Sequence, residues 1–171
     1  MTETGPVVSI VMGSKSDLEV MSEAAAILGE FGISHELRVI SAHRTPDRAH
    51  AFGRSAKEQG TKLIIAGAGK AAHLAGVMAS LTTLPVIGVP MPTSDLGGLD
   101  SLLSTVQMPG GVPVATTAIG KAGAKNAGLL AVAILAIADD LLATKLTRYR
   151  EKMLLEVEQA DEHVRKQTSA Q

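Results

Sequence analysis

Short runs of β-branched and aliphatic residues alternate along the chain with longer stretches whose apolar residues recur at helical spacing. Such alternation is typical of βα units wound into a parallel sheet that helices cover on both faces. A loop rich in Gly, Ser or Pro follows each short run. The predicted strands are Val7–Met12, His35–Ile40, Leu63–Ala68, Val86–Val89 and Val114–Ala118. The pattern therefore predicts an α/β fold on a parallel five-stranded sheet.

Two helices between these strands can be placed from their periodicity and their end signals. The first begins after Asp17, which stands where an N-cap residue belongs. Its predicted buried face consists of Leu18, Met21, Ala25 and Leu28. The second helix has Thr45 as its cap and Pro46 in its first turn, and it is expected to run to about Gln59.

The C-terminal part reads as two further helices. The apolar run Ala127–Ala138 is too short to cross a bilayer and predicts a buried helix. From Asp139 the chain becomes strongly charged, and its apolar residues keep helical spacing, which predicts a long amphipathic helix over about 139–168. These apolar positions are Leu142, Leu146, Tyr149, Met153, Leu154 and Val157. Such a helix either folds back on its own domain or packs on a neighbouring subunit.

Length and charge narrow the possible functions. The 171 residues predict a single domain over 1–171. A net charge of −1 from interspersed acidic and basic residues argues against a nucleic-acid or membrane-surface partner. There is no cysteine, so thiolate catalysis and thiolate metal sites are excluded. The N-terminal MTETGP lacks the features of a signal peptide, and we expect a cytoplasmic protein.

In an open parallel sheet, ligands bind at the carboxyl ends of the strands, beside helix N-termini. After the first predicted strand this rule selects a loop whose hydroxyls and backbone N–H groups suit a phosphate. Its candidates are Ser14 and Ser16, with Asp17 accepting hydrogen bonds from ribose hydroxyls. The alternative is that all three residues only cap the following helix. The loop is not a Walker A sequence, which argues against nucleoside triphosphate hydrolysis.

The loop after the second predicted strand places an imidazole, His43, next to a guanidinium, Arg44. Imidazole suits proton transfer at neutral pH, and a guanidinium holds phosphate in a two-pronged fork. A lone histidine is more often structural, but the strand-end position and the neighbouring Arg44 favour a functional role. The loop therefore predicts proton transfer next to an anionic substrate group.

The loop after the third predicted strand, Gly67–Ala72, matches the dinucleotide pattern G-x-G-x-x-[GA]. A Rossmann fingerprint would need an acidic residue ending the next strand, and none occurs before Asp95. We interpret the glycines as allowing close backbone approach to another flat or anionic ligand. His73 is either a substrate contact or part of the helix N-terminus. No metal-ligand motif such as HxH or HExxH occurs, so no metal site is predicted.

Two non-enzymatic classes share this fold. A flavin carrier usually stacks its ring on aromatic side chains, and Phe31, Phe52 and Tyr149 all lie outside the strand-end loops. A phosphoacceptor module needs an Asp at the end of the third strand, where this chain has Ala66–Ala68. A flavin- or nucleotide-binding module remains the non-enzyme alternative.

Four motifs follow one another in the chain: MGSKSD, SAHRTPD, AGAGKAAHLAG and SLLSTVQMPGGVPVATTAIG. With them the chain resembles, over roughly Val7–Leu142, the class I bacterial N5-carboxyaminoimidazole ribonucleotide mutases, also known as the catalytic subunit of phosphoribosylaminoimidazole carboxylase. SAHRTP and QMPGGVPVAT are far more specific than a glycine pattern. We expect the fold's core to span about the same residues, 7–142.

The resemblance implies a flavodoxin-like three-layer αβα sandwich, assembled as a homo-octamer and acting without metal or organic cofactor in de novo purine biosynthesis. It implies a small-molecule nucleotide substrate and transient contact with the ATP-dependent synthetase that makes it. His43 matches the catalytic histidine. The implied substrate-binding residues are Ser14, Ser16 and Asp17 in the nucleotide loop, Ser41 and Arg44 at the phosphate, and Gly69, His73 and Leu74 over the aminoimidazole.

In the implied mechanism, protonated His43 donates a proton as the N-carboxylate leaves, ring carbon C4 recaptures the confined CO₂, and neutral His43 removes the ring proton. Direct carboxylation of aminoimidazole ribonucleotide by free CO₂ is the runner-up. Two positions depart from the family. Lys70 stands where members usually carry Gly, and Ala75 where they carry Pro, which removes a fixed φ at the start of a helix. Lys70 either reaches the substrate carboxylate or points to solvent.

Overall fold

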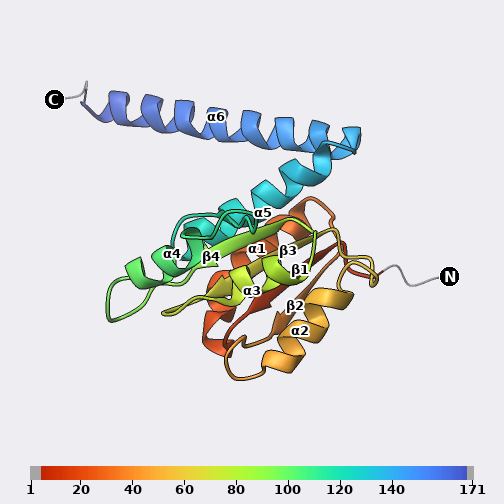
Figure 1. Cartoon of the computed structure of the whole chain (residues 1–171). Helices are drawn as coiled ribbons and strands as arrows, with labels where there is room; N and C mark the ends of the chain where they lie inside the picture. The colour runs from red at the N-terminus through yellow and green to blue at the C-terminus, as the bar shows by residue number, and fades with distance from the viewer. Residues whose placement is uncertain (1–4, 169–171) are drawn as a thin grey trace. The chain divides into compact units, whose positions relative to one another are not determined.

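The computed structural model describes residues 5–168, which form two compact units that meet in the sequence between Ala131 and Val132 (Figure 1). The single-domain organisation expected from the chain length stays a prediction. In chain order the elements are β1 (Val8–Met12), a 3₁₀ turn (Lys15–Asp17), α1 (Leu18–Glu30), β2 (His35–Val39), α2 (Pro46–Ser55), β3 (Leu63–Ala68), α3 (Leu74–Leu81), β4 (Val86–Pro90), α4 (Leu99–Val106), β5 (Ala115–Thr116), α5 (Gly120–Ala136) and α6 (Asp140–Thr168).

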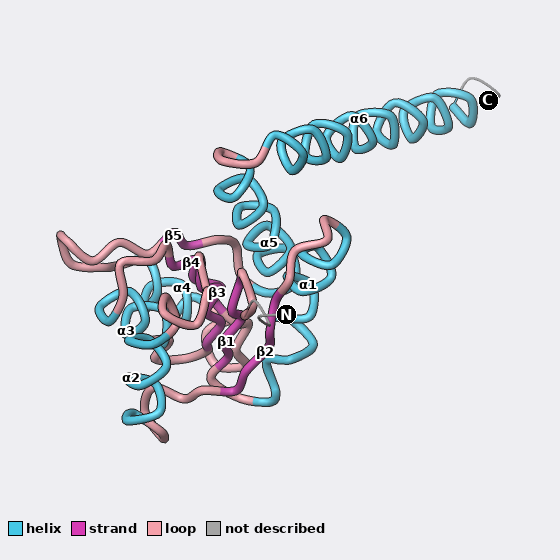
Figure 2. Tube along the Cα trace, turned by 90° about the vertical axis from the view of Figure 1, so that its right-hand side faces the viewer, coloured by secondary structure: helices cyan, strands magenta, loops and turns pink. Residues whose placement is uncertain are grey.

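The first unit contains a parallel five-stranded sheet in the order β2-β1-β3-β4-β5 (Figure 2). This confirms the predicted α/β fold, and the order is that of flavodoxin-like proteins. The last strand is shorter than predicted, because only Ala115 and Thr116 pair with β4. Pro113, which has no N–H to donate, precedes it, and the chain enters α5 at Gly120.

Helices cover both faces of this sheet. At Gly88 of β4, an added Cβ would meet Ala75 of α3 and Thr105 of α4, so these helices lie on one face together with α2. At Gly67 of β3, an added Cβ would meet Met21 of α1, which therefore covers the other face. The part of α5 before Val132 packs against α1, because an added Cβ at Gly128 would meet Ile27 of α1. The three layers confirm the predicted sandwich, and aliphatic side chains fill the core between them.

The buried face of α1 differs from the prediction. Leu18 is 42% exposed and Ala25 only partly buried, whereas Ala24 and Ile27 are buried beside Met21 and Leu28. The sequence MSEAAAIL offers small apolar residues on adjacent faces, so periodicity alone does not fix which one turns inward. The 3₁₀ turn before α1 leaves Leu18 at the exposed start of the helix.

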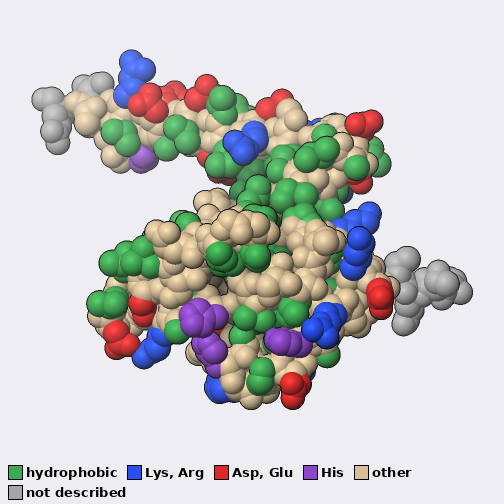
Figure 3. Space-filling model, viewed as in Figure 1, with side chains coloured by type: hydrophobic (Ala, Val, Ile, Leu, Met, Phe, Trp, Pro, Cys, Tyr) green, Lys and Arg blue, Asp and Glu red, His purple; other side chains and the backbone are tan. Residues whose placement is uncertain are grey.

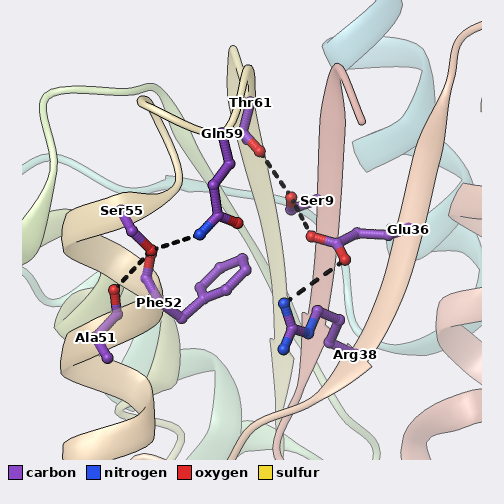
Figure 4. A network of polar contacts seen from close by, with 8 residues as sticks. All are labelled: Ser9, Glu36, Arg38, Ala51, Phe52, Ser55, Gln59 and Thr61. Atoms are coloured by element: carbon purple, nitrogen blue, oxygen red, sulfur yellow. Dashed lines mark hydrogen bonds and ion pairs between the residues drawn. The ribbon is translucent and has the colours of Figure 1, made fainter. Parts of the chain in front are cut away.

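A polar network lies under α2 at the edge of the sheet (Figure 4). The buried Ser9 hydroxyl donates to Glu36 Oε1 at 2.9 Å, so it accepts its second bond from the Thr61 hydroxyl, also at 2.9 Å. Arg38 pairs with Glu36 and stacks 5.3 Å from the ring centroid of Phe52. The network ties the edge strand β2 to β1 and to the start of β3, and it satisfies a hydroxyl that burial would otherwise leave unpaired.

We expect Gly123→Ala to destabilise the first unit. A Cβ at this position in α5 would collide with the backbone carbonyl of Ala118, and a backbone atom cannot move away by changing rotamer. Overpacking of this kind costs about 1–3 kcal/mol, which lowers the midpoint of thermal unfolding by roughly 2–4 °C per kcal/mol. Gly29→Ala in α1 is the matched control, because nothing lies within 4 Å of its added Cβ. Equal midpoints for the two variants would contradict this packing.

The second unit contains the predicted long C-terminal helix, α6, over Asp140–Thr168. Asp139 caps it, because its Oδ1 accepts hydrogen bonds from the backbone N–H groups of Leu141 and Leu142, both at 3.0 Å. Of the predicted apolar stripe, the residues up to Tyr149 are partly buried, and those from Met153 onward are exposed.

Within residues 5–168, no helix combines the length and the apolar character needed to span a bilayer.

Candidate active site

A pocket of about 510 Å³ opens at the carboxyl edge of the sheet, between the loops that follow β1, β2, β3 and β4. This volume lies within the range of small-molecule sites. The structure brings together every residue that the sequence predicted for the site, namely Ser14, Ser16, Asp17, Ser41, His43, Arg44, Gly69, Lys70, His73 and Leu74. On the face seen in Figure 3, histidine side chains are exposed close to acidic and basic ones.

The loop after β1 is folded by its own side chains. Ser14 caps the 3₁₀ turn, and its Oγ accepts a hydrogen bond from the N–H of Ser16 at 3.3 Å. Asp17 reaches back, so that its Oδ2 accepts from the N–H of Ser14 at 3.0 Å and its Oδ1 from the Ser16 hydroxyl at 3.2 Å. Ser14 and Asp17 therefore do cap a helical segment, but this segment is the 3₁₀ turn, and α1 has no side-chain cap bond. Each carboxylate oxygen keeps lone-pair capacity for a ligand hydroxyl.

Burial at the pocket wall raises the pKa of Asp17, and this outweighs the hydrogen bonds from Ser16 and Ser14 and the nearby charge of Arg44, which lower it. A carboxyl group with a higher pKa in the folded than in the unfolded protein binds protons more readily when folded. Its ionised form therefore opposes folding at neutral pH, and protonation relieves this as pH falls through the folded pKa.

We accordingly expect Asp17→Asn to be at least as stable as the wild type at pH 7, with a gain below about 1 kcal/mol because the group is partly exposed to water. The gain should shrink as pH falls through the raised folded pKa, toward a second pH below the ordinary carboxyl pKa of 3.8, where the group is protonated in both the folded and the unfolded protein. Urea unfolding at the two pH values measures the difference. A variant less stable than wild type at pH 7 would show that the carboxylate's hydrogen bonds outweigh its burial.

The loop after β2 holds a guanidinium across two strand ends. Arg44 Nη2 donates to the carbonyl of Gly13 at 2.7 Å, and its Nε donates to Ser41 Oγ at 3.3 Å. Three of its five N–H donors remain for an anionic ligand. Thr45 stands at the predicted cap of α2, but its hydroxyl donates back to the carbonyl of Ser41 and makes no cap bond to the helix.

His43 and His73 form a hydrogen-bonded pair inside the pocket lining. His43 Nε2 lies 2.9 Å from His73 Nδ1, with the rings edge to face at 83°. One nitrogen must donate and the other accept, so the tautomer of one ring fixes that of the other. His73 occupies the N-cap position of α3 without making a cap bond, and it lines the pocket; its contact with a substrate stays a prediction.

The loop after β3 comes close to the loop after β4. At Gly69 an added Cβ would lie 3.3 Å from Cβ of Met91, tighter than ordinary contact, so glycine here allows the two loops to touch. Lys70 follows with φ of 60°, and its Nζ pairs with Asp95 Oδ2 at 2.7 Å. Lys70 thus pairs with an acidic side chain, whereas the sequence analysis expected it to reach the substrate carboxylate or to point to solvent. Ala75, the other departure, is buried in α3, which begins at Leu74 without a proline.

The loop after β4 was missed by the sequence reasoning. Its residues 91–94 (Met91, Pro92, Thr93 and Ser94) line the pocket. The signal was available, because the same strand-end rule applies to the predicted strand Val86–Val89. The loop carries no histidine or basic residue, and a search for reactive side chains therefore passes over it.

No Phe, Tyr or Trp is among the residues that line this pocket, so it offers no aromatic side chain for stacking a flavin ring. In the part of the chain that the structure describes, residues 5–168, no three His, Asp or Glu side chains are grouped as a metal site would need.

Known proteins share this sequence and this fold. Residues 7–156 match the AIR carboxylase family. The N5-carboxyaminoimidazole ribonucleotide mutase of Thermotoga maritima is 60% identical over 152 residues, 89% of this chain and 88% of that protein. The mutase of Bacillus subtilis is 60% identical over 146 residues, 85% of this chain and 90% of that protein. The crystal structure of Treponema denticola PurE matches with a TM-score of 0.83 at 29% identity, covering 91% of this chain and 96% of that one. By its sequence, its fold and its strand-end motifs, the chain belongs to the AIR carboxylase family.

Proposed function

We propose that this protein is an isomerase that interconverts N5-carboxyaminoimidazole ribonucleotide and 4-carboxy-5-aminoimidazole ribonucleotide in de novo purine biosynthesis. The observation that carries the proposal is an identity of 57–60% over most of the chain to relatives named N5-carboxyaminoimidazole ribonucleotide mutase. The pocket supports it with a proton-transfer group, a guanidinium and a loop rich in hydroxyls in one cavity.

The nucleotide's phosphate binds at the loops after β1 and β2. Arg44 offers its remaining N–H groups, and Ser41, Ser14 and Ser16 add hydroxyls. Asp17 accepts hydrogen bonds from ribose hydroxyls. This arrangement directs the aminoimidazole toward the loop after β3, where Gly69 lets the backbone come close to a flat ring.

His43 then acts first as an acid and later as a base. Its proton passes to the exocyclic nitrogen as the bond from that nitrogen to the carboxylate carbon breaks, which gives aminoimidazole ribonucleotide and CO₂. Ring carbon C4 attacks the same CO₂, and neutral His43 removes the proton from C4. Over the cycle His43 gives up one proton and takes one back, and no co-reactant is consumed. Holding CO₂ beside C4 replaces its recruitment from dilute solution.

His73 acts on His43 by position. A hydrogen bond of 2.9 Å to His43 Nε2 holds the His43 ring in one orientation and offers a partner for either protonation state, depending on which nitrogen carries the shared proton.

The assay that tests the proposal follows conversion of N5-carboxyaminoimidazole ribonucleotide to its C4-carboxy isomer, with and without added bicarbonate. The proposal expects the same rate in both. Activity only on aminoimidazole ribonucleotide with CO₂ would instead identify a direct carboxylase, and no activity on either substrate would contradict both.

The homo-octamer, the contact with the synthetase that makes the substrate, and the cytoplasmic location belong to the same proposal. The family resemblance supports them.

A further inference from the structure

We propose that Lys70 and Asp95 form a clasp that ties the loop after β3 to the loop after β4 and so increases the affinity of the pocket for its nucleotide. Both are positioning residues in this account, since they act through the pocket wall. The identity of the nucleotide rests on the proposed function, whereas the clasp rests on the contacts of the two loops.

The backbone of Lys70 is held from α4. Its N–H donates to Oγ of the fully buried Ser101 at 2.9 Å, and its carbonyl accepts from the Ser104 hydroxyl at 3.3 Å. Lys70 also has a positive φ, unlike every other non-glycine residue in the described range 5–168. A glycine would adopt this conformation without strain, so the lysine side chain stands here at a conformational cost. These two backbone hydrogen bonds fix the position from which the Lys70 side chain extends.

The side chain spans the gap between the two loops. Lys70 Nζ donates to Asp95 Oδ2 at 2.7 Å, and the Ser94 hydroxyl donates to the other carboxylate oxygen at 3.3 Å. The hydrogen bond between the two raises the pKa of Lys70 and lowers that of Asp95, so both stay charged at neutral pH. The ion pair therefore persists under working conditions.

Each end of the clasp belongs to a loop that lines the pocket. Gly69 and Ala71 on either side of Lys70 line it, and so do Thr93 and Ser94 just before Asp95. Thr93 anchors the second loop, because its hydroxyl donates to Asp100 at 2.8 Å and accepts from the N–H of Gly98 at 3.1 Å. Asp95 lies between Thr93 and Gly98, and its ion pair with Lys70 links this part of the loop to the loop after β3. Without the ion pair, we expect residues 94–97 to become more mobile.

The test uses Lys70→Met, Asp95→Asn, the double variant, and the charge swap Lys70→Asp with Asp95→Lys. Met keeps most of the length of the lysine and the strain of its backbone but carries no charge, and Asp tolerates a positive φ. Lys62→Met is the matched control, because Lys62 is exposed and does not line the pocket. Calorimetry measures the dissociation constant of 4-carboxy-5-aminoimidazole ribonucleotide for each variant.

An exposed ion pair predicts that each single variant raises this dissociation constant by roughly two- to fivefold, that the double variant raises it no further, and that the swap restores it. Salt of about 1 M should remove the difference from wild type. The turnover number should fall less than the affinity. If Lys70→Met still weakens binding in the Asp95→Asn background, the ammonium contacts the ligand itself and the clasp is wrong.

Amide hydrogen exchange in residues 93–98 of the ligand-free protein tests the clasp without any nucleotide. Exchange should be faster to the same extent in Lys70→Met and Asp95→Asn and unchanged in Lys62→Met. Exchange equal to wild type in both single variants overturns the clasp. Wild-type protein that fails to bind the ribonucleotide would contradict the proposed function, while the exchange result would still decide the clasp.

Discussion

We expect His43→Asn to lower the turnover number for conversion of N5-carboxyaminoimidazole ribonucleotide by about 10²–10⁴-fold, the usual contribution of a general acid and base. Asparagine can keep a hydrogen bond to His73 Nδ1, but it cannot gain and release a proton at neutral pH. The exocyclic nitrogen then has no proton donor and C4 no base. Initial rates at saturating substrate measure the loss.

His50→Asn is the matched control. His50 lies exposed on α2 and does not line the pocket, so its removal should leave the rate within about twofold of wild type. The dissociation constant of the C4-carboxy isomer should change little in His43→Asn, which separates lost chemistry from lost binding. A rate in His43→Asn equal to that of His50→Asn would rule out His43 as the proton carrier.

Arg44→Ala should raise KM by roughly 10- to 100-fold with a smaller fall in the turnover number. Charge-assisted hydrogen bonds to a phosphate contribute about 1.5–3 kcal/mol, and a phosphate far from the reacting atoms is bound in the ground state and the transition state alike. The guanidinium also bridges Gly13 and Ser41, so its loss loosens the contact between two loops of the pocket. Steady-state kinetics over a range of substrate concentrations measures both parameters.

Arg48→Ala provides the comparison, because Arg48 is exposed in the first turns of α2 and does not line the pocket. Arg44→Lys should fall between wild type and Arg44→Ala, since an ammonium keeps the charge and loses the planar fork. A KM for Arg44→Ala no higher than that of Arg48→Ala would remove Arg44 from the phosphate site.

The sheet could be predicted from the sequence because its central strands, β1, β3 and β4, are buried on both faces. Leu63–Ala68 reads as one unbroken apolar run, and the structure has β3 with the same bounds. The candidate site followed from this framework. Parallel strands end at one edge, so His43 and Arg44 after β2 had to come near Ser14 after β1 and His73 after β3.

What the sequence did not predict depends on side-chain directions. Two histidines 30 residues apart can share a proton only if their rings meet, and only the structure places His43 Nε2 against His73 Nδ1. The partner of Lys70 was missed for the same reason, because Asp95 belongs to a loop without other charged residues near the pocket. In α1, adjacent small residues made the inward face ambiguous, and Leu18 is exposed.

The most direct test of the account follows the carboxylate carbon itself. Substrate labelled with ¹³C in the N5-carboxylate is converted by the wild-type enzyme in excess unlabelled bicarbonate, and the label in the C4-carboxylate of the product is measured by mass spectrometry. If the pocket confines CO₂ between its release and its recapture, nearly all of the label is retained. Label diluted to the level of the bicarbonate pool would show that CO₂ leaves before C4 attacks, and would contradict an isomerase that keeps CO₂ within the pocket.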